Sequence, residues 1–153
     1  KKQEKEPESV LTARENGNIR AIRFILSSLI FKKSFVDKNI DYKKLMPKQA
    51  DIIDVAIKGI PISSYYDYFD VDNNPILKDC LGVDFDKFAN ADKKYFDECV
   101  WLIASQNLVE KQTELAEKFT ATENKEERTK IAIELNALNK AIREKRLEEF
   151  YVR

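Results

Sequence analysis

Residues 92–120, DKKYFDECVWLIASQNLVEKQTELAEKFT, decide the fold of this chain. Neither glycine nor proline interrupts them, so nothing in the stretch breaks a helix. Their apolar side chains recur at spacings that place them along one helical face. These residues are Phe96, Cys99, Val100, Ile103, Leu108, Leu115 and Phe119. The stretch therefore predicts one helix of about 28 residues, roughly twice the length of an average helix in a globular protein.

A second long helix is predicted after it. Asn124 stands three residues before Glu127, which is the spacing of a capping box at the start of a helix. The helix is expected to run from Lys125 to about Tyr151, with an apolar stripe at steps of four, three and four residues. The stripe is Ile131, Leu135, Leu138 and Ile142. Two long helices joined by a short turn pack against each other, so residues 106–153 predict a terminal helical hairpin.

The side of the second helix opposite that stripe also carries apolar residues. At about 100° per residue, Ile133, Leu147 and Tyr151 lie roughly 160–200° from Ile131. A two-helix hairpin has no element of its own to cover that side, so these three residues are candidate anchors for a partner protein. The charged residues that would tune encounter and register beside them are Arg128, Lys140 and Arg143. Isolated exposed apolar residues are also ordinary on protein surfaces, and that interpretation stays open.

The preceding part of the chain predicts several shorter helices. A helical period begins at Ala13 and continues to about Lys33, and Gly59 and Pro61 end a later helix that begins at Pro47. Other short helices are expected at 42–46, 63–70 and 74–81, with caps at Asp41, Ser63 and Asn74. Helices this short form only when packed against neighbours. The predicted fold is all-α: a tether at 1–12, a helical bundle at 13–105 and the hairpin at 106–153.

The composition excludes several kinds of chemistry. The 153 residues include no histidine, two cysteines and three glycines. Imidazole-based catalysis and the usual zinc sites are therefore excluded, and neither standard glycine-rich phosphate loop is present. Asp70, Asp72 and Asn74 match the first positions of a calcium loop, but Pro75 stands where that loop needs glycine. We expect no catalytic residue, no metal and no cofactor in this segment.

The charges balance at 27 basic and 27 acidic residues. Residues 1–36 carry eight basic and four acidic groups, whereas residues 99–153 carry ten of each. Nucleic-acid binders usually concentrate a basic excess on one face, so direct nucleic-acid binding is not expected. The longest nearly apolar stretch, at 24–31, is too short to span a bilayer, and no signal peptide opens the chain. These features favour a cytoplasmic protein.

The remaining aromatic and thiol residues have ordinary interpretations. Cys80 and Cys99 are expected to be buried free thiols, and Trp101 is expected in the core. The cluster Tyr65, Tyr66, Tyr68 and Phe69 is too dense for a two-turn helix to bury completely. Some of these rings must face solvent, where they are either surface residues or a docking patch.

Two stretches resemble a known family. The first is Arg14-Glu-Asn-Gly-Asn-Ile-Arg-Ala-Ile-Arg-Phe-Ile-Leu, a glutamate followed by paired aliphatic residues. The second is Asn124-Lys-Glu-Glu-Arg-Thr-Lys-Ile-Ala-Ile-Glu-Leu-Asn-Ala-Leu-Asn-Lys, an acidic turn that leads into leucine spacing and a lysine. Together with the order of tether, bundle, long helix and hairpin, they resemble the C-terminal helicase-binding domain of bacterial DNA primase, the DnaG family.

The resemblance implies a function without catalysis. In that family the bundle and hairpin hold the primase on the N-terminal domains of the hexameric DnaB-type replicative helicase, which localises RNA primer synthesis during DNA replication. The catalytic part of such a primase would precede residue 1. The chain begins with Lys1 and its sole methionine is Met46, so we expect a fragment that lacks its N-terminal neighbour.

Three alternatives remain. The N-terminal domain of a replicative helicase has a similar plan of bundle and hairpin, and a nucleotide-binding motor would then follow residue 153. A stand-alone helical scaffold or regulator could dimerise through its hairpin. An enzyme is the third alternative, but without histidine only carboxylates or lysines could act, and no such pair stands out from the charged background.

Overall fold

The structure is a computed structural model that describes residues 13–82, 92–146 and 148–152. Within these ranges the chain forms helices and a single isolated bridge, so the all-α prediction is confirmed. The predicted tether at 1–12 lies outside the described residues. The elements are α2 (Ala13–Phe31), η2 (Lys33–Phe35), α3 (Tyr42–Leu45), η3 (Pro47–Gln49), α4 (Ala50–Ile57), η4 (Ile62–Ser64), α5 (Tyr65–Tyr68), η5 (Val71–Asn73), α6 (Pro75–Gly82), α7 (Lys93–Ala121), α8 (Lys125–Glu144) and α9 (Glu148–Tyr151).

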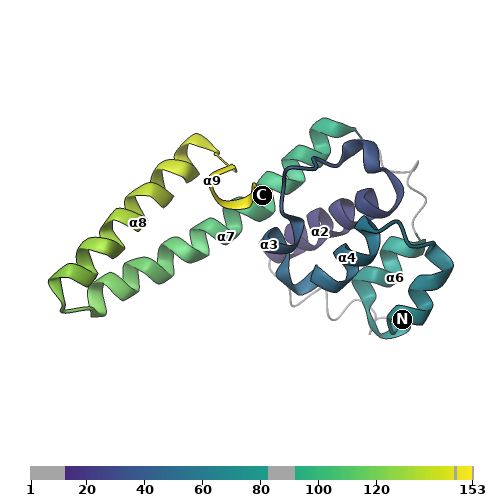
Figure 1. The fold of residues 1–153 in the computed structure, drawn as a ribbon, viewed down its shortest axis with the longest axis horizontal. Helices are drawn as coiled ribbons and strands as arrows, with labels where there is room; N and C mark the ends of the chain where they lie inside the picture. Colours follow the sequence, from purple (N-terminus) through teal and green to yellow (C-terminus); the bar gives the residue numbers. More distant parts are fainter. Residues whose placement is uncertain (1–12, 83–91, 147, 153) are drawn as a thin grey trace.

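The bundle is built around α2. This helix packs against α4, α6 and the first half of α7 (Figure 1). Phe24 of α2 and Phe96 of α7 are both completely buried at the centre of the bundle. Phe35 stands between them, with ring centroids 6.4 Å from Phe24 and 6.2 Å from Phe96. The short helices α3–α6 therefore owe their order to burial against two longer ones, as their length requires.

Polar side chains fix where several of these helices begin. The carboxylate of Asp41 accepts a hydrogen bond from the backbone N–H of Lys44 at 3.1 Å, and the amide oxygen of Asn74 accepts one from Leu77 at 3.1 Å. Both predicted caps are confirmed. The predicted cap before the tyrosine cluster is wrong, because η4 begins after Pro61 without a side-chain cap.

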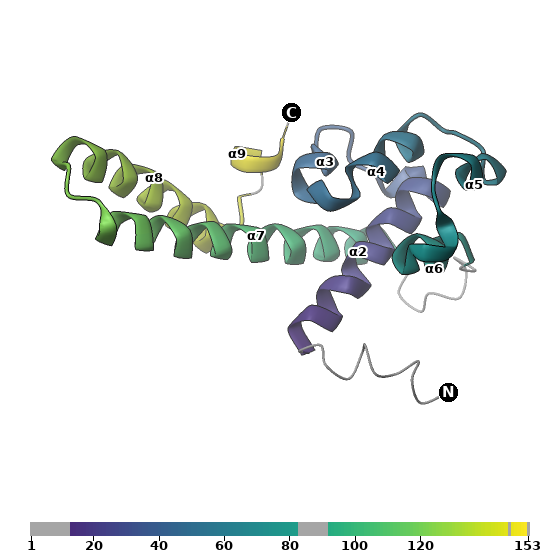
Figure 2. The ribbon, with the colours of Figure 1, turned by 90° about the horizontal axis from the view of Figure 1, so that it is seen from below.

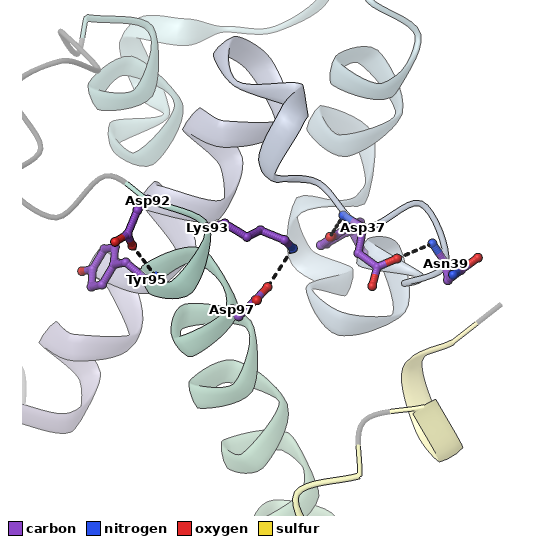
Figure 3. A network of polar contacts seen from close by, with 7 residues as sticks. Asp37, Asn39, Asp92, Lys93, Tyr95 and Asp97 are labelled. Atoms are coloured by element: carbon purple, nitrogen blue, oxygen red, sulfur yellow. Dashed lines mark hydrogen bonds and ion pairs between the residues drawn. The ribbon is translucent and has the colours of Figure 1, made fainter.

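Asp92 starts the long helix α7. Its carboxylate accepts a hydrogen bond from the backbone N–H of Tyr95 at 2.8 Å, which satisfies one of the amides that the first helical turn leaves unpaired (Figure 3). One turn further on, the ammonium group of Lys93 pairs with Asp97 at 2.8 Å. The predicted start of the helix, its length and its uninterrupted course are confirmed.

The same helix passes from the bundle into the hairpin. Figure 2 shows α7 entering the bundle beside α2 at one end and projecting with α8 as a two-helix arm at the other. The expected division between residues 105 and 106 falls inside α7, so no loop separates the two parts. We call the second half of α7 together with α8 the arm.

The predicted end of α8 is wrong. The helix stops at Glu144, about two turns before Tyr151, because Lys145 adopts a left-handed conformation with φ of 56°. The N–H of Arg146 then bonds back to the carbonyl oxygen of Ala141 at 3.0 Å. This arrangement is a usual way to end a helix, although glycine or asparagine more often occupies the left-handed position. The chain turns back, and α9 lies against the bundle rather than extending the arm.

Candidate docking surface on the helical hairpin

The inner face of the arm is apolar. Ile131 and Leu138 of α8 are buried, as is Leu115 on the facing side of α7. Leu135 and Ile142 are half-buried against the same core. All four residues of the predicted stripe therefore face inward, and this prediction is confirmed. Each turn of α8 contributes one apolar side chain to the contact with α7, which is the pattern of an amphipathic helix.

Polar contacts between the helices supplement this apolar interface. The amide nitrogen of Gln112 on α7 donates a hydrogen bond to the amide oxygen of Asn139 on α8, in a partly buried position. The ammonium group of Lys111 lies 3.7 Å from the carboxylate of Glu134 at the exposed edge. The amide pair fixes the register more strongly, because a partly buried donor without its acceptor is costly whereas exposed ion pairs contribute little.

Arg128 belongs to the tip of the arm rather than to its outward face. The amide oxygen of Asn124 accepts a hydrogen bond from the N–H of Glu127 at 3.0 Å and starts α8. One residue later, the guanidinium carbon of Arg128 lies 4.3 Å from the ring centroid of Phe119 on α7. Such a cation–π contact stabilises the turn between the two helices. Its position therefore favours a role in the turn between α7 and α8 over a role as a charge beside the outward anchors.

Ile133 does face outward. Its side chain is 64% exposed, the largest exposed fraction among the large apolar residues of the described chain. Ala137 and Lys140 follow at steps of four and three residues and are also exposed. We call Ile133, Ala137 and Lys140 the α8 outer face. Arg143 is exposed at its border, and nothing in the described residues covers Ile133.

The other two predicted anchors do not join Ile133. Leu147 lies outside the described residues. Tyr151 is only 6% exposed and contributes to the main apolar core, so its assignment as an outward anchor is wrong. The physical reason is the early end of α8: the angular argument holds only while the helix continues, and the turn at Lys145 redirects everything after it. Burial raises the pKa of the Tyr151 hydroxyl above its ordinary value.

Sequence reasoning missed two exposed apolar residues on α7. Leu102 and Val109 are each 36% exposed, and their spacing of seven residues places them on the same helical face. The signal was available, because both lie off the face that Phe96, Val100 and Ile103 bury. Trp101, expected in the core, is half-buried at its border.

The bundle offers little reactive chemistry. Cys80 and Cys99 are both buried, and burial raises the pKa of each thiol to about 11, so both are protonated and unreactive at neutral pH. Across the described residues, no three or more cysteine or carboxylate side chains gather where they could hold a metal ion. Tyr66 and Tyr68 face solvent, and the expectation that part of the tyrosine cluster is exposed is confirmed.

None of the helices in the described ranges is both long enough and apolar enough to cross a membrane. Comparison with known proteins brings no family to this chain: no family model, no curated protein and no solved structure matches it.

Proposed function

We propose that this chain is a docking module that holds a primase on the N-terminal domains of a hexameric replicative helicase. The observation that carries the proposal is the arm itself, a two-helix extension of the bundle whose outer face presents Ile133 to solvent. The order of bundle, continuous long helix and hairpin is the feature in which the chain resembles the helicase-binding domain of bacterial primases.

The composition of the arm suits docking into a groove. A partner helix or groove would bury Ile133 and leave Lys140 and Arg143 at the rim, where charges govern the rate of encounter more than the affinity. Helices commonly dock by setting apolar side chains of one face into a neighbouring groove. On α7, Leu102 and Val109 are further exposed apolar residues that a partner could contact.

Substitution of Ile133 tests the proposal directly. Ile133→Glu places a charge where a buried anchor should be, and glutamate is a good helix former, so α8 should keep its structure. We expect the variant to bind a hexameric replicative helicase from the same organism at least tenfold more weakly in a fluorescence titration, which corresponds to about 1.4 kcal/mol.

Tyr66→Glu is the matched control. Tyr66 is 60% exposed, almost as much as Ile133, but it lies on α5 at the far end of the bundle from the arm (Figure 2). The control should bind as the unchanged chain does, and circular dichroism should show equal helix content for all three proteins. Equal affinity of the Ile133→Glu variant and the control would refute the docking role of the α8 outer face.

Light scattering separates this proposal from a self-associating scaffold. A docking module for another protein should keep its monomer mass as its concentration rises in the absence of helicase. A mass that doubles with concentration in the unchanged chain, and not in Ile133→Glu, would instead assign the α8 outer face to a second copy of the chain.

A further inference from the structure

The last residues of the chain are attached to the bundle at a point far from α8 in sequence. The backbone N–H of Asp41 donates a hydrogen bond of 2.6 Å to the carbonyl oxygen of Tyr151, and Ile40 forms an antiparallel bridge with Val152. The side chain of Tyr151 is buried in the main core, and Phe150 is half-buried against it. The segment thus makes both backbone and side-chain contact with the bundle.

The loop that receives this segment is already ordered by its own hydrogen bonds. The N–H of Asn39 bonds to the carboxylate of Asp37 at 2.9 Å, and the N–H of Asp37 bonds to the hydroxyl oxygen of Tyr42 at 3.0 Å. Figure 3 shows this loop with the C-terminal segment passing nearby. Asp41 caps α3 with its side chain, which leaves its N–H available to Tyr151. The receiving edge therefore does not depend on the C-terminal segment for its shape.

Asn107 links the same segment to α7. Its amide nitrogen donates a hydrogen bond to the carbonyl oxygen of Leu45 at 2.9 Å. The same side chain partly offsets the rise that burial causes in the pKa of the Tyr151 hydroxyl. Asn107 lies at the middle of α7, between the half that packs in the bundle and the half that belongs to the arm. Three segments, the loop at α3, the middle of α7 and α9, thus meet at the base of the arm.

We propose that residues 148–152 form a releasable clasp, which fastens the far end of α8 to the bundle and keeps Tyr151 out of solvent. When the clasp is closed, the arm is joined to the bundle at two places, through α7 and through α9. When it opens, α7 alone joins them, and the aromatic residues at the end of the chain become accessible. This inference does not depend on the proposed function, because it concerns only contacts within the chain.

The clasp is built to open at lower cost than the core. A helix of four residues has no stability of its own, so α9 persists only while it is docked. Lys145, which leads into it, adopts a left-handed conformation that is unfavourable for a residue with a side chain. Docked segments that have no stable secondary structure of their own can open locally while the rest of the protein stays folded.

Opening of the clasp could change how easily α7 bends at the base of the arm. At the junction, the hydroxyl of Ser105 bonds to the carbonyl oxygen of Leu102 at 3.1 Å within α7. Hydrogen bonds of this kind compete with the helical backbone and are associated with bending. With the clasp closed, both the packing of α7 in the bundle and the docking of α9 oppose bending of α7 at Ser105. With the clasp open, only the packing of α7 opposes it.

Amide exchange followed by NMR reports on the clasp directly. The N–H of Asp41 is protected by its bond to Tyr151, so its exchange rate measures how often the clasp is open. In the full chain, Tyr151→Ala should raise that rate at least tenfold, and Tyr151→Phe, which keeps the buried ring but loses the hydroxyl, should raise it by a smaller factor. Tyr66→Ala removes an exposed ring and should leave the rate unchanged.

Double electron–electron resonance between two spin labels then measures the distance from the tip of the arm to the bundle. One label is placed at Glu123 at the tip and the other at Asp51 on α4, both by substitution of exposed residues with cysteine. The native thiols are buried and protonated at neutral pH, so they should not take up label. We expect a broader distance distribution in Tyr151→Ala than in the unchanged chain or in Tyr66→Ala.

Two results would overturn the proposal. If Tyr151→Ala leaves the exchange of the Asp41 amide unchanged, then Tyr151 does not hold the clasp. If exchange rises tenfold while the distance distribution stays the same, the clasp opens without freeing the arm. Should Tyr151→Ala fail to fold by circular dichroism, the milder Tyr151→Phe variant decides in its place, through the same two measurements.

Discussion

The backbone N–H of Asp41 donates a hydrogen bond of 2.6 Å to the carbonyl oxygen of Tyr151 and so joins the loop before α3 to the last helix. A chain that sends a long helix out of its bundle would ordinarily leave the end of the returning helix without support. Here that end is brought back to the base of the arm. The hairpin therefore leaves the bundle through α7 and is fastened to it again through α9.

Truncation of Tyr151 should destabilise the whole chain. Its ring is buried in the main core, and removing a large buried aromatic side chain costs about 3–5 kcal/mol. Because α9 is short and can move into the vacated space, we expect the lower end of this range for Tyr151→Ala in urea denaturation. Tyr68→Ala serves as control, since Tyr68 is exposed and should cost less than about 1 kcal/mol. A loss below 1 kcal/mol for Tyr151→Ala would show that its burial contributes little.

Cys80 should make the chain less stable at alkaline pH. Burial raises the pKa of its thiol from 9.0 to about 11, so the folded state holds this proton more tightly than the unfolded state does. The stability that the protonated Cys80 thiol contributes to the folded state is therefore complete below pH 9 and decreases as the pH rises toward 11.

Comparison of the unchanged chain with Cys80→Ala isolates this effect from other groups that titrate at high pH. Between pH 8 and pH 10.5, the free energy of unfolding should fall by about 1–2 kcal/mol more in the unchanged chain, since one pKa unit corresponds to about 1.4 kcal/mol. Parallel losses in the two proteins would mean that the thiol does not ionise on unfolding as expected.

The amide pair Gln112–Asn139 should show a measurable coupling energy. Each side chain is partly buried between α7 and α8, where an unpaired amide cannot be fully hydrated. We expect a double-mutant cycle with Gln112→Ala and Asn139→Ala to give an interaction of about 0.5–1.5 kcal/mol. The exposed pair Lys111–Glu134 is the matched comparison across the same two helices and should give less than about 0.5 kcal/mol. Equal coupling of the two pairs would contradict the difference in burial.

Loss of the Asp92 cap should weaken the start of α7. Asp92→Ala leaves the N–H of Tyr95 without its acceptor, and removal of such a cap costs about 0.5–2 kcal/mol. Asp97→Ala, one turn further on, breaks an exposed ion pair with Lys93 and should cost less. Thermal unfolding followed by circular dichroism distinguishes the two variants, and a reversed order would argue against the cap.

The long helices could be predicted because their signals are local. An uninterrupted apolar period predicts α7, and Asn124 followed by Glu127 predicts the start of α8. The inward stripe from Ile131 to Ile142 follows from geometry that any straight helix obeys. The same local signals placed Asp41 and Asn74 correctly as caps.

The position of Tyr151 could not be predicted in this way. No glycine, asparagine or proline marks the end of α8, because the residue in the left-handed conformation is Lys145. What favours the turn is tertiary: Tyr151 gains a buried site and a backbone partner at Asp41, which lie outside any local window. As a result, only Ile133 of the three proposed anchors is observed on the outward face, with Lys140 beside it.

The continuity of α7 has a mechanical consequence. Its 29 residues form a rod of about 43 Å, at roughly 1.5 Å per residue, and one end of that rod is embedded in the bundle beside the buried Phe96. A pull on the tip of the arm would not be absorbed by stretching a linker, because the described backbone contains none at that point. It would act as a torque on the core of the bundle, with α9 as the brace that resists it.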